Sequence, residues 1–514
     1  MTDKTSETTY AVAGTPKAKP AVVVFGTDRT STVGQIDRRS NQLAHFFRDR
    51  GLQPGDRIAI LLKNCTEYLE IVWGAQRAGL IYVPVNWHLT GSETTYIVSN
   101  SDAQILFVSA ELVAQGPQSE EQAPSLGATV VVGAEGLLSS GIDYAAALSS
   151  FADVPIADEV EGVFMFYSSG TTGRPKGIAR TVEGMPFGTG LPMEQMLIAA
   201  YGISVSTVYL TPAPLYHAAP LGWCIAVARA GGTLVVMERF DAIEALRAIE
   251  EHRVTHVQFT PTMFVRMLKL DKEIRESFDM SSLQVVVHAG APCPVDVKYS
   301  IIDWFGPIVY EYYSGSEANT YFVIDSQTWL QRPGSVGRAA VGSARILDDD
   351  GRSLPTGAVG TVWFEGGPDF AYHKDPIATA KAHNDSGWTT LGDMGRLDED
   401  GYLYLMDRRA DLILTGGVNV YPREVEEVLI SHPNVADAAV FGVPDDEMGQ
   451  AVKAVVALRV PSTGQAAELI DYCRSRLAHF KCPRSVDFTD ELPRLPSGKL
   501  LRRVLQEQYW SPAT

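Results

Sequence analysis

The segment from Tyr167 to Gly177, "YSSGTTGRPKG", has the composition of a loop that binds phosphate. It combines hydroxyl side chains, glycines and a lysine, and the backbone N–H groups of such loops bind anions. A Walker loop, G-x-x-x-x-G-K-[ST], counted from Gly170 would place Lys176 correctly. Pro175, however, stands at the second glycine and has no N–H, and Gly177 has no hydroxyl for Mg²⁺. The segment therefore predicts a phosphate loop of another kind.

Four further segments share a composition of small residues around a charged or aromatic side chain. They are "PLYHAAP" (214–220), "HAGAPCP" (288–294), "EYYSGSEAN" (311–319) and the stretch from "WTTLGD" (388–393) to "DRRADLILTGGVNVYP" (407–422). Packing alone gives little reason for this composition, so we treat these segments as candidate site loops. His217 and Glu317 are their most distinctive side chains.

The elements that position these loops can be expected from the apolar pattern. Buried strands are predicted at 57–62, 103–109, 233–237, 254–260 and 283–290. A helix is predicted at 240–252, where Ile243, Leu246 and Ile249 recur at helical spacing. This alternation of strand and helix is typical of α/β layers around largely parallel strands.

From about residue 410 the pattern changes into a small α+β set. Helices are predicted at 421–432, where Pro422 suits the first helical position, and at 466–480. Strands are predicted at 435–443 and 451–460. The short, charged connection near 407–411 is a candidate hinge between a large and a small domain.

The composition is that of a soluble globular protein. The chain has 514 residues, 45% of them hydrophobic and 20% charged, and a formal net charge of −18. A charge of this sign disfavours nucleic acid and anionic membranes as partners. The five cysteines are unclustered and indicate reduced thiols in the cytoplasm rather than disulfides or a zinc site. We recognise no secretory signal or membrane-spanning segment, and expect residues 1–18 to be disordered.

In their order and spacing the motifs resemble those of the adenylate-forming superfamily, and within it the AMP-forming acyl-CoA synthetases. The resemblance extends from "GLQPGDRIAILLKN" (51–64) to "LPRLPSGKLLRR" (492–503). It implies an α/β fold with a large N-terminal domain of several subdomains, residues 1–408. A small, mobile α+β domain, residues 409–514, would follow a hinge near 408–411.

The resemblance also implies a nucleotide site. The β- and γ-phosphates of ATP would be bound by Ser168, Ser169, Gly170, Thr171, Thr172, Gly173 and Lys176. Adenine would lie between Tyr313 and the run Gly290, Ala291 and Pro292. Asp393 would bind the ribose hydroxyls and Arg408 the ribose or phosphate, while Ser316 keeps a hydroxyl for phosphate. Glu317 would bind Mg²⁺, directly or through water.

The reaction implied is attack of a carboxylate on the α-phosphorus of ATP, which yields acyl-AMP and pyrophosphate. Lys499 would bridge the acyl carboxylate and the α-phosphate. Rotation of the small domain would then withdraw this lysine and present Gly416 and Gly417 to the pantetheine of CoA. His217 would flank the acyl carboxylate as an orienting group. The candidate acyl contacts are Trp223, Tyr312 and Gly315.

Several of these residues also have a purely structural interpretation. His217 could be an ordinary half-buried histidine, Glu317 could cap a helix, and Lys499 could be a solvated lysine of the tail. The Gly416-Gly417 pair could form a simple turn, and Trp223 and Tyr312 could pack in the core. Two departures from the family pattern stand out: a glycine displaced to position 315, expected to reshape the acyl pocket, and Ala410, where the family's hinge usually has Asp or Lys.

The sequence thus predicts an ATP-dependent acyl-CoA synthetase with ATP, Mg²⁺ and CoA as cofactors or co-substrates. The apolar segment 182–202, interrupted by glycine and proline, predicts a hydrophobic acid and a role in fatty acid metabolism, with fatty, aromatic and alicyclic acids left open. Alternatives are transfer to the phosphopantetheine of a carrier protein, a luciferase-like oxygenase, and a nucleotide-binding regulator without turnover. Amino-acid activation is disfavoured because 214–220 offers no Asp. A homodimer is left open.

Overall fold

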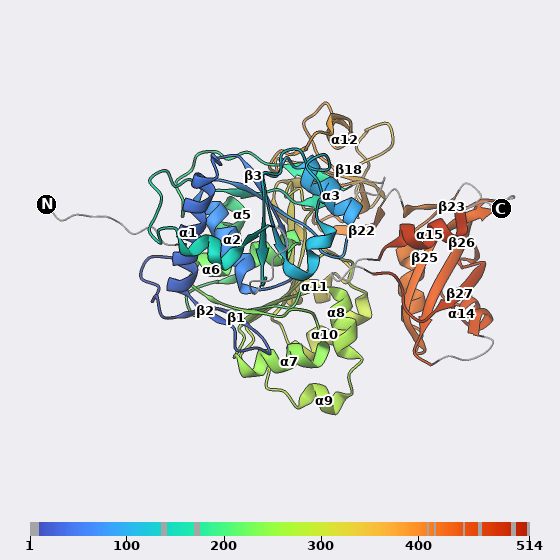
Figure 1. Cartoon of the computed structure of the whole chain (residues 1–514). Helices are drawn as coiled ribbons and strands as arrows, with labels where there is room; N and C mark the ends of the chain where they lie inside the picture. The colour runs from blue at the N-terminus through green and yellow to red at the C-terminus, as the bar shows by residue number, and fades with distance from the viewer. Residues whose placement is uncertain are drawn as a thin grey trace. The chain divides into compact units, whose positions relative to one another are not determined.

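The computed structural model describes residues 10–134, 141–168, 175–408, 411–415, 418–445, 448–460, 465–494 and 500–510 (Figure 1). The chain divides into two units. The first unit contains residues 1–259, 269–287 and 370–380, and the second contains residues 260–268, 288–369 and 381–514. Helices and strands alternate through much of the chain, as predicted for an α/β protein.

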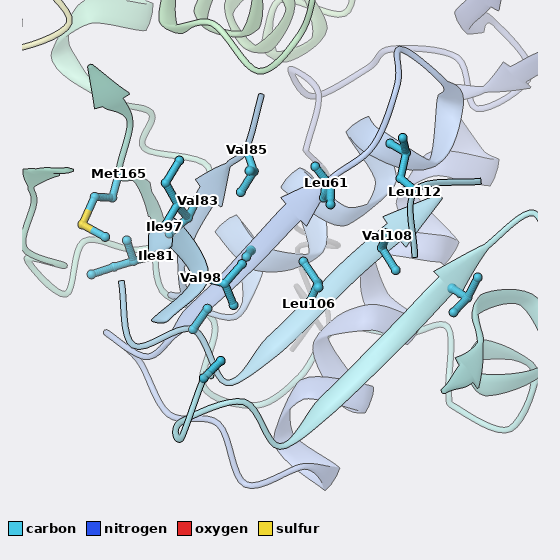
Figure 2. Packing of buried hydrophobic residues seen from close by; sticks show 14 of the residues in the cluster. Leu61, Ile81, Val83, Val85, Ile97, Val98, Leu106, Val108, Leu112 and Met165 are labelled. Carbon is cyan, nitrogen blue, oxygen red and sulfur yellow. The ribbon is translucent and has the colours of Figure 1, made fainter. Parts of the chain in front are cut away.

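The first unit contains a parallel sheet whose strands run in the order β7-β6-β5-β3-β4-β8. Their bounds are Ile142–Asp143, Ala128–Val132, Ile105–Ser109, Arg57–Leu61, Ile81–Pro84 and Val163–Phe164. One face packs on helix α3 (Gly91–Asn100), whose Ile97 and Val98 belong to the same buried apolar cluster as Leu106 and Val108 of β5 (Figure 2). On the neighbouring position of β5, Phe107 meets Phe47 of α1 (Val33–Asp49). Side chains alternate between two covered faces, which explains the continuous apolar strand sequences.

Helices α1 and α2 (Thr66–Arg77) lie side by side (Figure 1). They approach so closely that a Cβ on Gly74 would lie 2.5 Å from the Cβ of Leu43. Tyr10 packs on Trp73 of α2, with ring centroids 5.0 Å apart, and is buried. Tyr10 is thus an apolar anchor near the start of the described residues, which the polar composition around it conceals, and the disorder expected for residues 1–18 stays a prediction.

A second sheet of the first unit has the strand order β14-β13-β11-β12-β1-β2. The bounds are Val285–His288, His256–Phe259, Val208–Thr211, Thr233–Val236, Pro20–Val24 and Thr30–Thr32. Strands β13, β11, β12 and β1 pair in parallel, and β2 pairs with β1 antiparallel. Helix α6 (Ala218–Arg229) connects β11 to β12, and α7 (Ala242–Glu251) connects β12 to β13. The five predicted buried strands and the predicted helix at 240–252 are all confirmed.

The second unit contains antiparallel strands in two groups. The first is β15-β16-β17, with bounds Val309–Tyr313, Tyr321–Asp325 and Arg338–Val341. The other is β18-β19-β21-β22, with bounds Ser343–Leu347, Gly360–Glu365, Asp393–Leu397 and Leu403–Arg408. Helix α10 (Val295–Phe305) precedes β15.

The last part of the second unit is a five-stranded sheet with helices. The strands are β23 (Ile413–Thr415), β24 (Val418–Val420), β25 (Val435–Asp445), β26 (Gly449–Leu458) and β27 (Ser485–Thr489). The helices are α13 (Pro422–Ile430), α14 (Gln465–Arg474) and α15 (Arg502–Trp510). Pro422 begins α13 as predicted, whereas α14 ends earlier than the predicted 480, where Arg476 N–H turns to the carbonyl of Cys473. No helix in the described part of the chain is both long and apolar enough to span a bilayer.

Candidate functional site

The two ends of the phosphate-loop segment pair with each other. Strand β9 (Tyr167–Ser168) runs antiparallel to β10 (Lys176–Ala179), so that Lys176 lies opposite Ser168. The strands therefore close the loop at its base. The central residues Ser169, Gly170, Thr171, Thr172 and Gly173 lie outside the described residues, and their phosphate contacts stay a prediction.

The structure gives a reason for the glycine that breaks the Walker pattern. A Cβ on Gly177 would lie 2.8 Å from the ring of Tyr167, whose hydroxyl donates to Asn100 Oδ1 at 2.7 Å. A serine or threonine at position 177 would collide with that ring. The ammonium of Lys176 lies 5.2 Å from the ring centre of Tyr372. A cation–π contact positions the ammonium group without neutralising its charge, so Lys176 can still attract a phosphate group.

In the second unit, two residues predicted to bind one nucleoside are in direct contact. The hydroxyl of Tyr313, at the end of β15, donates a hydrogen bond of 2.5 Å to Asp393 Oδ2 at the start of β21. Asp393 lies opposite Arg408 in the antiparallel pair β21–β22. The hydrogen bond thus joins the base candidate, at the end of a strand in one sheet, to the ribose candidate in a second sheet, where the phosphate candidate is its cross-strand neighbour. The side chain of Arg408 is outside the described residues.

The predicted adenine segment follows directly after β14. Gly290 has a φ of +84°, a conformation that other residues rarely adopt. A Cβ built there would meet nothing within 4 Å, so the chain leaves open space beside this glycine. Pro292 is exposed and Ala291 half-buried. An exposed turn of small residues is suited to lie against a flat ring.

A buried charged cluster adjoins this segment. The ammonium of Lys298 (α10) donates to Glu311 Oε2, and His288 Nε2 lies 3.6 Å from the same oxygen. Neither ring nitrogen of His288 makes a hydrogen bond within the described part of the chain. Burial, together with the nearby lysine, holds the pKa of His288 well below its usual range, so the imidazole is neutral. Sequence reasoning missed this cluster. The available signal was that Glu311 lies two residues before Tyr313 on one strand, and therefore on the same face of it.

Glu317 lies in a loop that Gly315 allows to close. A Cβ on Gly315 would lie 2.6 Å from Glu317 Oε2 and 2.7 Å from the side chain of Leu391. The displaced glycine therefore makes room for the carboxylate. The loop is held by the Ser314 hydroxyl, which donates to the Thr320 carbonyl at 2.6 Å. The chain then enters strand β16 rather than a helix, which excludes the helix-cap interpretation of Glu317.

The segment before His217 is fixed by a residue that sequence reasoning also missed. The buried side chain of Asn64 donates to the carbonyls of Ala213 and Met237, at 3.0 and 2.9 Å, and accepts from Leu215 N–H at 2.8 Å. His217 follows as the N-cap residue of α6, with its ring 4.5 Å from that of Tyr216. The available signal was an asparagine two residues after the predicted strand 57–62, because an amide that becomes buried there must find hydrogen-bond partners.

Trp223 and Tyr312 both have the packing role that the sequence offered as an alternative. Trp223 is buried and stacks on Tyr209, with centroids 5.7 Å apart. Tyr312 stacks on Tyr321 at 4.9 Å. Contact of either ring with an acyl group stays a prediction, as does the hydroxyl role of half-buried Ser316. Lys499, Gly416, Gly417 and Ala410 lie outside the described residues.

Two family models match this chain. The model for the AMP-binding enzyme matches residues 9–369, and that for the AMP-binding enzyme C-terminal domain matches residues 424–499. The chain belongs to the AMP-binding enzyme family. The first match covers more than half of its length, and the second accounts for the small C-terminal domain.

Similar proteins cover nearly the whole chain. The fatty acid–[acyl-carrier-protein] ligase ScoC of Streptomyces coeruleorubidus is 33% identical over 96% of this chain and 93% of its own. The long-chain-fatty-acid–CoA ligase FadD13 of Mycobacterium tuberculosis is 31% identical over 95% of both chains. The crystal structure of ATP-bound MatB from Rhodopseudomonas palustris has a TM-score of 0.82 and 28% identity over 96% of both chains.

These similarities establish the type of enzyme. The protein is an AMP-forming acid–thiol ligase of the adenylate-forming superfamily, with a large N-terminal α/β domain and a small C-terminal domain. The alternative of a nucleotide-binding regulator without turnover is thereby set aside.

Proposed function

We propose that this enzyme is an acyl-CoA synthetase, which activates a hydrophobic carboxylic acid as acyl-AMP and transfers the acyl group to CoA. The observation that carries the proposal is the hydrogen bond from Tyr313 to Asp393, with Asp393 opposite Arg408. An aromatic ring hydrogen-bonded to a carboxylate, with an arginine at the cross-strand position of that carboxylate, suits the base, ribose hydroxyls and phosphate of one nucleotide.

In the first half-reaction, a carboxylate oxygen of the acid attacks the α-phosphorus of ATP. The bond from that phosphorus to the bridging oxygen breaks, and pyrophosphate leaves with the electron pair. Because both reactants are anions, the main task of the protein is to offset their repulsion and to align them. We assign Lys499 to the acyl carboxylate and α-phosphate, and Lys176 with Ser168 and residues 169–173 to the β- and γ-phosphates.

Magnesium is the cation that this site would hold, and Glu317 is its protein ligand in our proposal. Mg²⁺ commonly takes one or two carboxylates together with substrate phosphates and water. Glu317 is only 8% exposed, and the described residues include no group of three or more His, Cys, Asp or Glu suited to a metal. A single carboxylate fits an ion that arrives with ATP. Bound there, the ion would neutralise charge on the phosphates.

In the second half-reaction, the CoA thiol gives up its proton to solvent and its sulfur attacks the acyl carbon. A C–S bond forms, the bond from that carbon to the phosphate oxygen breaks, and AMP leaves with the electron pair. We place the domain boundary at 408–409 and the hinge near 408–411. Rotation there would withdraw Lys499 and bring Gly416 and Gly417 to the pantetheine, where glycine permits close backbone approach. His217 would orient the acyl carboxylate.

A hydrophobic acid is the substrate class that we favour. Residues 182–202 are apolar and contain the buried Phe187, and we infer that they line the acyl site. The printed names of two relatives, the ligase FadD13 and a feruloyl-CoA synthase of Amycolatopsis 33% identical over 93% of this chain, refer to long-chain fatty and feruloyl groups. Both groups are largely hydrophobic. A fatty substrate would place the enzyme in fatty acid metabolism.

A carrier protein is the second candidate acceptor. The similarity to ScoC, named as an acyl-carrier-protein ligase, favours it specifically. CoA and carrier proteins present the same phosphopantetheine thiol, so the first half-reaction would be unchanged.

ATP–pyrophosphate exchange over a panel of carboxylic acids, followed by thioester assays with CoA, tests this proposal. We expect acid-dependent exchange, and CoA-dependent thioester with the best acid. Lys499→Ala should lose exchange by about 10²- to 10³-fold, as when one transition-state donor is removed. Lys272→Ala, which alters an exposed lysine paired with Glu276, is the matched control and should behave as wild type. Exchange without a CoA thioester would favour the carrier protein, and absence of exchange with every acid would contradict the proposal.

A further inference from the structure

A buried carboxylate holds the backbone of segment 186–191 in the first unit. Glu161 is 1% exposed, and its Oε2 accepts hydrogen bonds from the N–H groups of Gly188 and Gly190, at 3.0 and 3.2 Å. These glycines have φ of +92° and +74°. Glycine adopts such positive φ values readily, and at both positions here the N–H group points at the same carboxylate oxygen. The segment is therefore shaped around Glu161.

The other oxygen of Glu161 leads to a second carboxylate through an arginine. Arg229, the last residue of α6, donates to Glu161 Oε1 and, through Nε at 2.5 Å, to Glu194 Oε2. Glu194 is 3% exposed and accepts from Leu191 N–H at 3.1 Å, in the first turn of α5 (Pro192–Tyr201). The guanidinium also lies 5.0 Å from the ring centre of Trp73. One network thus joins the segment, α5 and α6.

Helix α6 carries other residues proposed for the acyl site. His217 lies at its N-terminus, and Trp223 packs against Tyr201 of α5, with centroids 4.9 Å apart. In segment 186–191, the ring centre of Phe187 lies 4.5 Å from the guanidinium of Arg77. That guanidinium is itself paired with Asp37 and Glu159. A change in the network would therefore move backbone and ring together.

The charges in this network suit positioning better than stabilisation. Two carboxylates share one guanidinium in the interior, and burial raises the pKa of Glu194. Buried ionic groups of this kind contribute little net stability compared with apolar residues of the same volume, because desolvation offsets their attraction. Hydrogen bonds to fixed backbone groups, by contrast, define geometry. Burying these charges costs desolvation free energy, and fixing the shape of segment 186–191 is a role that explains why they are buried.

We propose that Glu161, Arg229 and Glu194 are positioning residues that fix segment 186–191 and thereby set which acids the enzyme accepts. The inference rests on the proposed function, in which residues 182–202 line the acyl site. None of the three residues is required to touch the reacting atoms; they act through the backbone at Gly188, Gly190 and Leu191.

The test is Glu161→Gln, which keeps the size of the side chain and removes its charge. We expect KM for the best acid to rise about tenfold or more, since hydrogen bonds to a buried charge are among the stronger ones. The ratio of kcat/KM between long and short acids should also change, while KM for ATP stays the same. Asp158→Asn is the matched control, because Asp158 is nearby in sequence but pairs with Arg48 at the surface.

Hydrogen exchange of peptides covering 186–191 gives a readout that needs no activity. Exchange should be about tenfold faster in Glu161→Gln and unchanged in Asp158→Asn. Glu194→Gln should show the same acid-specific effect, and it carries the test if Glu161→Gln does not fold. Three results would overturn the proposal: unchanged hydrogen exchange of segment 186–191, an unchanged order of kcat/KM among the acids, or an equal rise of KM for the acid and for ATP. Wild type inactive with every acid would instead mark failure of the proposed function.

Discussion

The hydroxyl of Tyr313 donates a hydrogen bond to Asp393 Oδ2 although 80 residues separate them in the chain. One residue ends strand β15 and the other begins β21, so two antiparallel sheet segments of the second unit meet at this bond. The bond fixes the orientation of the Asp393 carboxylate, which we assign to the ribose hydroxyls. A site whose polar groups are already oriented loses less entropy when it binds a nucleotide.

Tyr313→Phe tests whether that bond contributes to ATP binding. The ring that we assign to adenine is kept, while Asp393 loses the hydrogen bond from the Tyr313 hydroxyl. Hydrogen bonds to charged groups contribute about 1.5–3 kcal/mol, so KM for ATP should rise by roughly 10- to 100-fold. KM for the acid should change little. Steady-state kinetics with varied ATP would measure this.

Tyr299→Phe is a control for the loss of a tyrosine hydroxyl, because Tyr299 is exposed, packs on Trp329 and is not among the residues assigned to the nucleotide. It should leave both KM values unchanged. An unaltered KM for ATP in Tyr313→Phe would show that the bond is incidental to nucleotide binding.

Gly315→Ala should impair the enzyme through Glu317. The new methyl group would lie 2.6 Å from the Glu317 carboxylate, so that side chain must move from its place in the loop. If Glu317 binds Mg²⁺ with ATP, the variant should need a higher Mg²⁺ concentration for half-maximal exchange and lose activity by about tenfold or more. Gly91→Ala is the control, since its Cβ would meet only ordinary contacts at 3.7 Å. An unchanged Mg²⁺ requirement would contradict the role of Glu317.

The sequence alone predicted the positions of the buried strands and the order of the candidate site loops along the chain. Continuous apolar runs such as 103–109 leave few alternatives to a parallel strand covered on both faces, and β5 has that environment. Tyr313 and Asp393 could likewise be named from motifs. Their hydrogen bond could not, because it depends on where two distant strands end.

The charged clusters show what a sequence conceals. Glu161, Arg229 and Lys298 look like solvated surface residues in a linear reading, since such side chains are seldom fully buried. Their burial follows only from partners that the fold brings together, such as Glu194 for Arg229 and Glu311 for Lys298. Tyr10 was missed for the same reason: its partner Trp73 is far away in the chain.

Lys298→Met should strongly destabilise the second unit. It leaves the Glu311 carboxylate buried without its cation, beside a neutral His288, and breaking a buried pair in this way costs about 3–5 kcal/mol. Adding Glu311→Gln removes the stranded charge, so the double variant should unfold at a higher denaturant concentration than Lys298→Met alone. Arg247→Met, which breaks an exposed pair with Glu244, should change the midpoint little. If the double variant were less stable than Lys298→Met, the interpretation of Lys298 and Glu311 as a simple ion pair would be wrong.

Glu70→Gln should alter how stability depends on pH. Glu70 is 7% exposed and accepts a hydrogen bond of 2.7 Å from the Tyr144 hydroxyl. Burial raises its pKa to about 7, and the charge of Glu67 adds to this, while the Tyr144 hydrogen bond and Arg39 act in the opposite direction. The folded protein therefore keeps a proton that the unfolded chain has already lost above about pH 4.3.

The sign of the effect follows from that proton. The contribution of Glu70 to stability is full below about pH 4.3 and is lost as pH rises towards 7, by about 1.4 kcal/mol for each pH unit in that window. Gln does not titrate, so the melting temperature of Glu70→Gln relative to wild type should be higher at pH 8 than at pH 5. Glu244→Gln, at an exposed position, should show no such trend. Melting curves at both pH values decide the matter, and a difference independent of pH would mean that Glu70 is ionised in the folded protein.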